Sequence, residues 1–259
     1  GGPPRPRHRS VQGELEAVLG TLFARPARVL GSGRTDRGVH ALGQVAAVDA
    51  PARWDAPSLK RAVNALVTKE IWVCAAAEVA PDFHPRYDAV ERVYIYRVGL
   101  TEAARSPFHN RWCWEVRRQL DRALLDHVTA VIPGDHSFAA FAKAGQEERG
   151  DRCIVYSAGW RTWEGMGLEF TISANRFLHH MVRYLVGTLV EIAAGDRPPE
   201  HMERLLAGDP ELETSPPAPP HGLYLAAVRY PDGAYPAQDQ PTTVERSVWS
   251  SRTSKRPIG

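Results

Sequence analysis

The spacing of apolar residues over the first hundred positions predicts two helices followed by two strands. Ser10 is a good N-cap, and the apolar positions that follow it form one helical stripe, at 11, 15, 18, 19 and 22. A second helix is predicted over residues 57–67, because Pro57 suits a first helical turn. Strands are predicted over residues 71–79 and 92–100. The later strand alternates cleanly and places three side chains on one face: Tyr94, Tyr96 and Val98.

Beyond residue 110 the pattern predicts two more helices and three strands. One helix is expected over residues 120–132, where Pro133 and Gly134 stop the pattern, and the other over residues 177–194. The second helix carries the most regular apolar stripe of the chain, and Gly195 caps it. The residues of that stripe are Leu178, Val182, Leu185, Leu189 and Ile192. The strands are expected over residues 153–163, 167–174 and 222–230.

Both halves of the chain mix helices with strands that are not uniformly apolar. This favours an α+β fold with antiparallel sheet covered on one face. A linker is expected around residues 100–110, so we predict an N-terminal domain over residues 10–105 and a C-terminal domain over residues 106–232. The two ends are polar and rich in proline, and they are expected to form a disordered arm and tail: residues 1–9 and 233–259.

Composition excludes several classes of protein. With 43% apolar and 24% charged residues the chain is typical of a soluble globular protein, and its net charge of +2 indicates no particular nucleic-acid partner. All but four of the 32 cationic residues are arginine, which suits phosphate binding, although a GC-rich genome is the commoner cause of such an excess. The three cysteines have no CxxC spacing, which argues against a zinc site or disulfides and fits a reducing cytoplasm. No stretch resembles a membrane span or a signal peptide.

Four glycines, at positions 31, 33, 38 and 43, lie between two short predicted strands over residues 27–30 and 44–48. Glycines spaced in this way permit positive φ or a close approach to a ligand. Between them, Arg34 and Asp36 are two residues apart and would share a face of extended backbone. Two interpretations of Arg34 and Asp36 are about equally good. The two residues form a catalytic pair, or they form a surface ion pair in a tight turn between two strands. A phosphate-binding P-loop is excluded, because no Gly-Lys-Ser/Thr follows.

The run from Gly33 to Val45 reads GRTD-x-GVHA-x-GQV, and it resembles the active-site segment of the tRNA pseudouridine synthase A (TruA) family. The resemblance implies that Asp36 is the catalytic carboxylate of an isomerase that converts uridine to pseudouridine in tRNA. The implied targets are uridines 38–40 of the anticodon arm, and the reaction needs no cofactor. The implied fold has two α/β subdomains, whose mainly antiparallel sheets join into one extended central sheet with the active cleft between them.

Other segments resemble the family at the implied substrate site. His179-His180-Met181-Val182-Arg183 is similar to the family's HHMVR, which implies that Arg183 pairs with Asp36. Residues 91–96, 82–87 and 222–225 also match family segments, and the first implies that Tyr94 stacks on the target uracil. The implied substrate-binding residues are Tyr94, Arg34, Arg183 and Leu223. Contacts with the rest of the RNA are expected from Arg37, Phe83, His84, Arg86, His179 and His180.

Several of these residues have plain structural alternatives. Without the family resemblance, Tyr94 would be interpreted as an aromatic residue that faces the core from a half-buried strand. Arg183 lies at the edge of an apolar stripe, where an arginine commonly buries its stem and keeps its charged group in water. His179 and His180 suggest a metal site, but we expect no metal, because adjacent residues on a helix point about 100° apart.

The chain also departs from the family's pattern. Arg37 stands where a small residue is common, and it either assists RNA binding or points to solvent. The family's N-terminal YDG- and GWQ-type segments are absent, so the resemblance runs from about Ser10 to Asp232 and we expect the chain as given to be incomplete at its start. The resemblance implies a homodimer that acts on tRNA. The alternatives are a non-catalytic tRNA- or RNA-binding protein on the same fold, and a metal- or phosphate-dependent enzyme with a small-molecule substrate.

Overall fold

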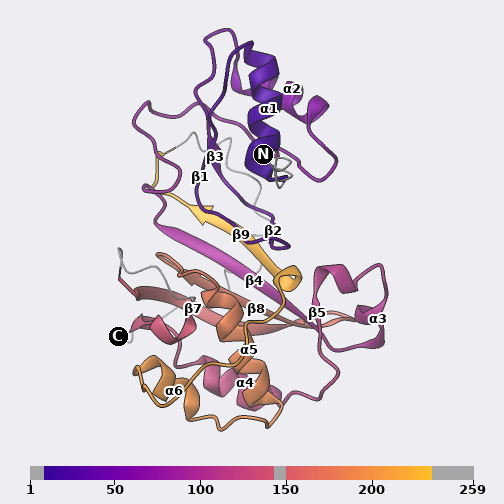
Figure 1. The fold of residues 1–259 in the computed structure, drawn as a ribbon, viewed down its shortest axis with the longest axis vertical. Coiled ribbons are helices and arrows are strands. Elements are labelled where there is room, and N and C mark those ends of the chain that lie inside the picture. The colour runs from indigo at the N-terminus through magenta and orange to yellow at the C-terminus, as the bar shows by residue number, and fades with distance from the viewer. Residues whose placement is uncertain (1–8, 143–149, 235–259) are drawn as a thin grey trace, which may run out of the picture. The chain divides into compact units, whose positions relative to one another are not determined.

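The computed structural model describes residues 9–142 and 150–234, and the chain divides into two compact units (Figure 1). The first unit comprises residues 1–30, 46–84 and 231–259, and the second comprises residues 31–45 and 85–230. Nearly all of the arm and tail expected at the two ends lies outside the described residues. Within the described ranges, no helix is both long enough and apolar enough to cross a membrane.

The first unit contains the two helices predicted from the sequence. α1 (Val11–Phe23) begins after Ser10, whose hydroxyl accepts a hydrogen bond of 3.1 Å from the Gly13 N–H. α2 (Ala56–Leu66) begins after Asp55, whose carboxylate accepts from the Ser58 N–H at 2.7 Å. These caps satisfy backbone donors that have no partner within their own helix. The helices share a small core of four buried side chains: Leu19, Phe23, Val29 and Val63. Two short strands, β1 (Leu30–Gly31) and β3 (Ala46–Ala47), pair with each other.

The prediction of a strand over residues 71–79 is wrong, because this segment has no regular secondary structure. The backbone of Val73 is bound by a side chain instead of a neighbouring strand. Asn64 of α2 donates from Nδ2 to the Val73 carbonyl at 2.9 Å and accepts from the Val73 N–H at 2.8 Å. A side-chain amide that satisfies both backbone groups replaces the ladder that an alternating pattern predicts.

The second unit is built on a seven-stranded mixed sheet. Six strands follow one path in the order β2-β9-β4-β8-β7-β6, and β5 pairs with the end of β4. Two pairs are parallel, β2 with β9 and β4 with β5, and the remaining pairs are antiparallel. The strand bounds are β2 His40–Ala41, β4 Glu91–Gly99, β5 Trp114–Glu115, β6 Gly134–Ser137, β7 Arg152–Trp163, β8 Gly167–Ala174 and β9 Leu223–Arg229.

Helices cover one face of this sheet. Figure 1 shows α4 (Arg122–Thr129), α5 (Met181–Ala193) and α6 (His201–Leu206) on the same side of the strands. The main core forms where this face meets the helices, and its members include Phe170 and Leu185. This arrangement confirms the predicted α+β fold with a sheet covered on one face. The shorter helical segments are α3 Glu102–Arg105, η1 Asn110–Trp112, η2 Ala139–Phe141 and η4 Pro220–Gly222.

The strands predicted for residues 92–100, 153–163, 167–174 and 222–230 are confirmed as β4, β7, β8 and β9, and the helix over residues 120–132 as the shorter α4. The helix predicted over residues 177–194 begins four residues later than expected. His180 adopts a left-handed conformation with φ of 66°, so the helical backbone begins only at Met181. At the other end Gly195 has φ of 81° and donates to the Ile192 carbonyl, as a glycine cap does.

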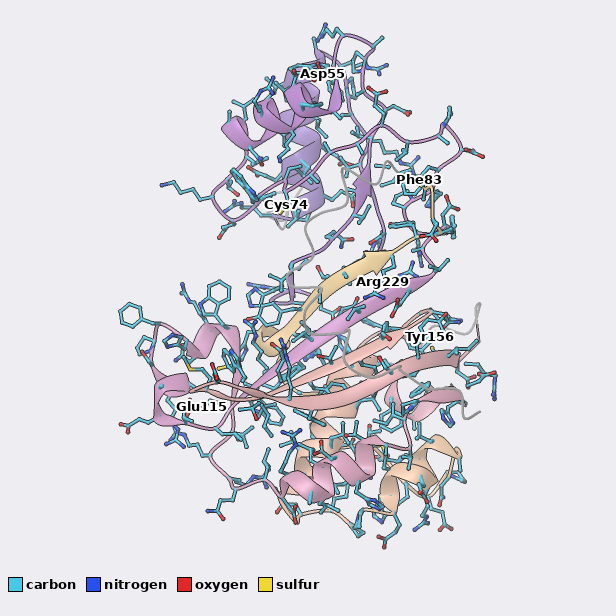
Figure 2. The ribbon with its side chains drawn as sticks, turned by 180° about the vertical axis from the view of Figure 1, so that it is seen from behind. Asp55, Cys74, Phe83, Glu115, Tyr156 and Arg229 are labelled. Atoms are coloured by element: carbon cyan, nitrogen blue, oxygen red, sulfur yellow. The ribbon has the colours of Figure 1, made fainter. Side chains whose placement is uncertain are left out.

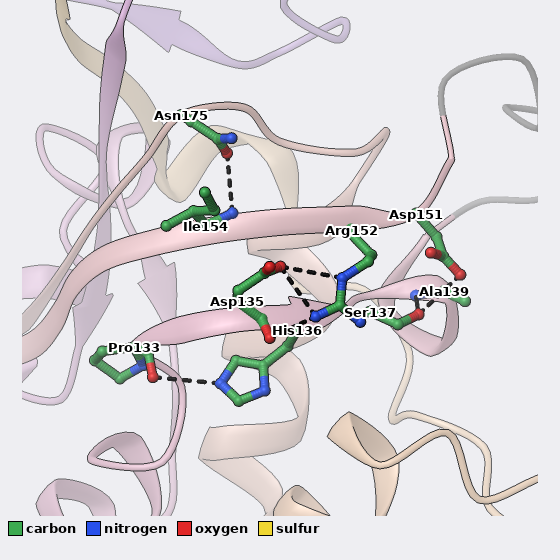
Figure 3. Close-up of polar contacts among 9 residues, drawn as sticks. All are labelled: Pro133, Asp135, His136, Ser137, Ala139, Asp151, Arg152, Ile154 and Asn175. Carbon is green, nitrogen blue, oxygen red and sulfur yellow. Dashed lines mark hydrogen bonds and ion pairs between the residues drawn. The ribbon is translucent and has the colours of Figure 1, made fainter.

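The far edge of the sheet is held by a polar network that the sequence did not reveal (Figure 3). Arg152 at the start of β7 pairs with Asp135 of β6, with 3.2 Å between its Nε and Oδ1. Ser137 Oγ donates to Asp151 at 2.8 Å, and the Ile154 N–H donates to Asn175 Oδ1 at 3.0 Å. Asn175 follows β8 directly, so this contact fixes the start of the segment that leads to His179 and His180.

The two units do not coincide with the domain boundary expected at residues 105–106. β4, which falls in the expected N-terminal domain, pairs along its length with β8 and with β9, both of which belong to the expected C-terminal domain. A strand bound on both sides in this way belongs to the same layer as its neighbours. The division into domains over residues 10–105 and 106–232 stays a prediction.

Candidate active site

Asp36 lies at the first position of a tight turn in the glycine-rich segment. The Val39 N–H donates to the Asp36 carbonyl at 3.1 Å, which closes a four-residue turn. Gly38, at the third position, has φ of 84°, a conformation that side-chain-bearing residues rarely adopt. A Cβ at this position would also lie 3.2 Å from the Pro220 ring. The turn therefore requires a glycine two residues after the carboxylate.

The segment is fixed to the sheet after this turn. β2 runs parallel to β9, with His40 beside Tyr224, and the Leu42 N–H donates to the Leu225 carbonyl at 2.8 Å. A Cβ at Gly43 would collide with the Ala226 carbonyl, so glycine permits this close approach. The side chain of Gln44 closes the loop, because it accepts from Ser32 Oγ at 2.6 Å and donates to the Gly33 carbonyl at 3.0 Å.

Three cationic or potentially cationic side chains converge on the Asp36 carboxylate. His179 Nε2 lies 3.0 Å from Oδ1, and His180 Nε2 lies 2.9 Å from Oδ2. The Arg183 guanidinium lies 3.5 Å from Oδ2. The side chain of Asp36 is 27% exposed, so the carboxylate is half-buried and still partly accessible.

Arg183 is fixed by a second contact. Its Nε donates to the Ala218 carbonyl at 2.7 Å, and its side chain is only 12% exposed. The Ala218 N–H donates in turn to the Arg183 carbonyl at 2.9 Å. This geometry does not match an arginine whose charged group reaches for solvent. The guanidinium instead bridges the 218–222 segment and the carboxylate.

The two histidines do not lie on the helix as expected. Both precede α5, and their ring centroids are 4.0 Å apart. The argument that adjacent helical residues diverge therefore does not apply, and one ligand atom from each of Asp36, His179 and His180 lies within 4.8 Å of the others. Carboxylate and imidazole are donors that zinc accepts, but the Arg183 cation beside the same carboxylate opposes a second cation. The absence of a metal stays a prediction.

Tyr94 lies close to this cluster on β4. Burial raises the pKa of its hydroxyl to about 12, and the nearby Asp36 charge acts in the same direction. The edge of its ring meets Phe177, with 4.9 Å between the centroids. Leu223, at the start of β9, is buried in the main core. Tyr94 is thus a neutral aromatic side chain near the carboxylate, which suits contact with a base as well as packing.

Two of the other predicted residues, Arg34 and Arg37, are close to Asp36 in the sequence but do not pair with it in the described part of the chain. Arg34 and Arg37 are exposed, and among the described residues no ion pair joins either of them to Asp36. Arg86 is also exposed, with its guanidinium 6.0 Å from the Tyr87 ring centroid. Phe83, labelled in Figure 2, and His84 belong to the first unit, whereas Asp36 belongs to the second.

Arg92 is a residue of the site region that the sequence did not reveal. Its guanidinium donates to the Arg86 carbonyl at 2.7 Å, to the Asn175 carbonyl at 2.9 Å and to the Ser32 carbonyl at 3.5 Å. It therefore joins three segments that lie far apart in the sequence. Burial lowers the pKa of this guanidinium, but an arginine remains charged at neutral pH. Its only sequence signal is a cation two residues before Tyr94, and the same strand carries a second cation at Arg97.

A half-buried carboxylate held by cationic partners, on an α+β sheet, is the kind of site that an enzyme presents. The family model described as tRNA pseudouridine synthase matches residues 4–88 and 131–231. The chain belongs to this family, which confirms the resemblance found in the sequence.

Individual relatives agree with the family assignment. The "tRNA pseudouridine synthase A" of Roseiflexus sp. (strain RS-1) is 40% identical over 235 residues, covering 90% of this chain and 86% of that protein. The protein of the same name from Halalkalibacterium halodurans is 40% identical over 222 residues, covering 85% and 83%. That of Thermus thermophilus is 37% identical over 227 residues, covering 86% and 88%.

Proposed function

We propose that this chain isomerises uridine to pseudouridine in tRNA, with Asp36 as the catalytic carboxylate and uridines 38–40 of the anticodon arm as its targets. Membership of the tRNA pseudouridine synthase family supports the reaction and the substrate class. The role of Asp36 is supported by one observation. His179, His180 and Arg183 converge on its half-buried carboxylate.

The reaction suits a site of this composition. The bond between N1 of uracil and C1′ of the ribose breaks, the base turns, and C5 bonds to C1′. The proton leaves C5 and N1 gains one, so no electrons are gained or lost and no redox cofactor is needed. A carboxylate can serve by attacking the base, by attacking the sugar or by removing a proton, and each role needs it ionised and fixed.

The other predicted residues complete the proposal. Tyr94 and Leu223 would line the site against the turned base, and Arg183 would pair with Asp36. Arg34, Arg37 and Arg86 would contact phosphates, and Phe83, His84, His179 and His180 would contact nearby nucleotides. We further propose a cytoplasmic homodimer that binds the anticodon arm of tRNA and uses neither metal nor cofactor.

A pseudouridine assay on unmodified tRNA tests the proposal. Chemical labelling or mass analysis would locate the product after incubation with the parent chain and with Asp36→Asn. The matched control is Asp49→Asn, which changes an exposed aspartate of the first unit. We expect product from the parent and from Asp49→Asn, and none from Asp36→Asn. Bound tRNA without product from any of the three would favour the non-catalytic RNA-binding alternative.

A further inference from the structure

The two oxygens of the Asp36 carboxylate are held differently. Oδ2 contacts His180 at 2.9 Å and Arg183 at 3.5 Å, and both of these side chains are largely buried. Among the described residues, Oδ1 has one such partner, His179 at 3.0 Å, and the His179 side chain is 39% exposed. A carboxylate oxygen has two lone-pair directions. Within the described part of the chain Oδ1 therefore has one partner, the more exposed His179, whereas Oδ2 has two largely buried partners.

His180, which contacts Oδ2, has an unusual backbone conformation. It is one of two non-glycine residues with positive φ in the described part of the chain, and its φ is 66°. A left-handed conformation is unfavourable for a residue with a side chain, and such strain persists where the surroundings require it. The Tyr184 N–H donates to the His180 carbonyl at 3.1 Å, in the first turn of α5. The same turn carries Arg183, so His180 and Arg183 are fixed together.

We propose that His180 is a positioning residue that fixes Oδ2 of Asp36 together with Arg183, while His179 covers Oδ1, the reacting oxygen, until the target uridine replaces it. This inference rests on the proposed function, because it assigns a task within the reaction of Asp36. The ring of His180 limits where Oδ2 can lie, because its Nε2 is 2.9 Å from that oxygen. The buried histidine thus orients the carboxylate, and the exposed histidine is the one that a substrate can displace.

The test compares kcat and KM for tRNA in variants of the two histidines. His180→Gly removes the ring and suits the left-handed backbone, so it should fold at least as well as the parent. His180→Gln and His179→Gln keep a side-chain N–H donor in place of Nε2–H, and His179→Ala removes it. The matched control is His136→Ala on β6, where the ring contacts the Pro133 carbonyl at 3.3 Å (Figure 3). Each protein is also melted thermally and analysed for bound zinc.

We expect His180→Gly to lower kcat about 100-fold, because small misplacements of a reacting group have effects of this size. KM should change by no more than about twofold, and His180→Gln should recover roughly tenfold of the lost kcat. His179→Ala should lower kcat by about tenfold or less, with His179→Gln near the parent. His136→Ala should match the parent in both constants.

Three results would overturn the inference. An unchanged kcat in His180→Gly would show that the ring does not position Asp36. A raised KM with unchanged kcat in His180→Gly would make that histidine an RNA contact only. Stoichiometric zinc in the parent that is lost in His179→Ala and His180→Gly would make the pair metal ligands. The proposed function fails on other grounds, namely an inactive parent or an active Asp36→Asn, so the two failures are distinguishable.

Discussion

Arg92 on β4 donates to the backbone carbonyl of Asn175 at 2.9 Å, although 83 residues separate them in the sequence. The same guanidinium reaches the Ser32 carbonyl at the start of the glycine-rich segment. It therefore joins the chain that leads to Asp36 with the chain that leads to His179 and His180. The segment that carries Asp36 and the segment that carries the two histidines are thus both bound by the half-buried guanidinium of Arg92. Both contacts are made with backbone carbonyls.

Replacing Arg92 with alanine should destabilise the second unit. The change leaves backbone carbonyls of Ser32, Arg86 and Asn175 without their donor, and hydrogen bonds to a charged group contribute about 2 kcal/mol. Arg92→Lys should recover little, because one ammonium cannot reproduce a planar fork. Urea unfolding measures the effect, and kcat should fall with it.

The control for this measurement is Arg229→Ala, at the end of β9 (Figure 2). Arg229 pairs with Glu91 at 3.0 Å on the surface, and exposed pairs contribute only about 0–1 kcal/mol. A loss in Arg92→Ala no larger than in Arg229→Ala would contradict the linking role of Arg92.

Arg183→Lys should lower kcat strongly while leaving the fold intact. The arginine contacts both the Ala218 carbonyl and Asp36 Oδ2, and a single ammonium cannot satisfy both. Loss of one fixed hydrogen-bond donor beside a reacting group typically costs about 100-fold in kcat. Single-turnover assays measure this step, with Arg204→Lys in the exposed pair with Asp209 as the control. Equal rates for the parent and Arg183→Lys would mean that the guanidinium geometry is not used.

Removal of metal ions should leave the activity unchanged. Although Asp36, His179 and His180 could together hold a metal, the Arg183 cation already contacts the same carboxylate. Prolonged dialysis against EDTA followed by a pseudouridine assay tests this expectation. A loss of activity that zinc restores would show that the cluster holds a metal in the working enzyme.

Much of the fold could be predicted because long elements have clear periodicity. β4, β7, β8 and α1 follow their alternating or helical patterns closely. Strands of two residues, such as β2 and β5, carry no periodic signal, since their pairing depends on β9 and β4 being present. The failed strand at residues 71–79 has a different cause. Its backbone groups at Val73 are bound by the Asn64 side chain, which no local pattern reveals.

The candidate site was predictable to a different degree. Asp36 and Arg183 were predicted from motifs, and the structure brings their side chains together from positions far apart in the chain. The contacts of both histidines with Asp36 were not predictable, because they require the left-handed backbone of His180 in place of a continuous helix. The linking role of Arg92 was also not predictable, since its partners are backbone carbonyls, which have no sequence signature.

Gly38→Ala should destabilise the protein and lower kcat. Its φ of 84° costs a residue with a Cβ about 1–2 kcal/mol, and the new methyl group would press on Pro220. Relief of that strain would move the turn that carries Asp36. The control is Gly159→Ala on β7, where a Cβ meets no atom of the described residues within 4 Å. Urea unfolding should show a lower stability for Gly38→Ala than for Gly159→Ala, and kcat should also be lower for Gly38→Ala. Equal stability and equal kcat in the two variants would contradict the requirement for glycine at position 38.

Alkaline pH should weaken the fold through Tyr94. Burial raises the pKa of its hydroxyl from about 10 in the unfolded chain to about 12 in the folded protein. The folded state therefore holds this proton more tightly than the unfolded state does. The resulting stability is complete below pH 10 and is lost as the pH rises towards 12. Denaturant unfolding at pH 9, 10 and 11 should show a fall in the parent that is less steep in Tyr94→Phe, which has no proton to lose. If stability fell equally steeply with pH in the two proteins, burial would not raise the pKa of the Tyr94 hydroxyl.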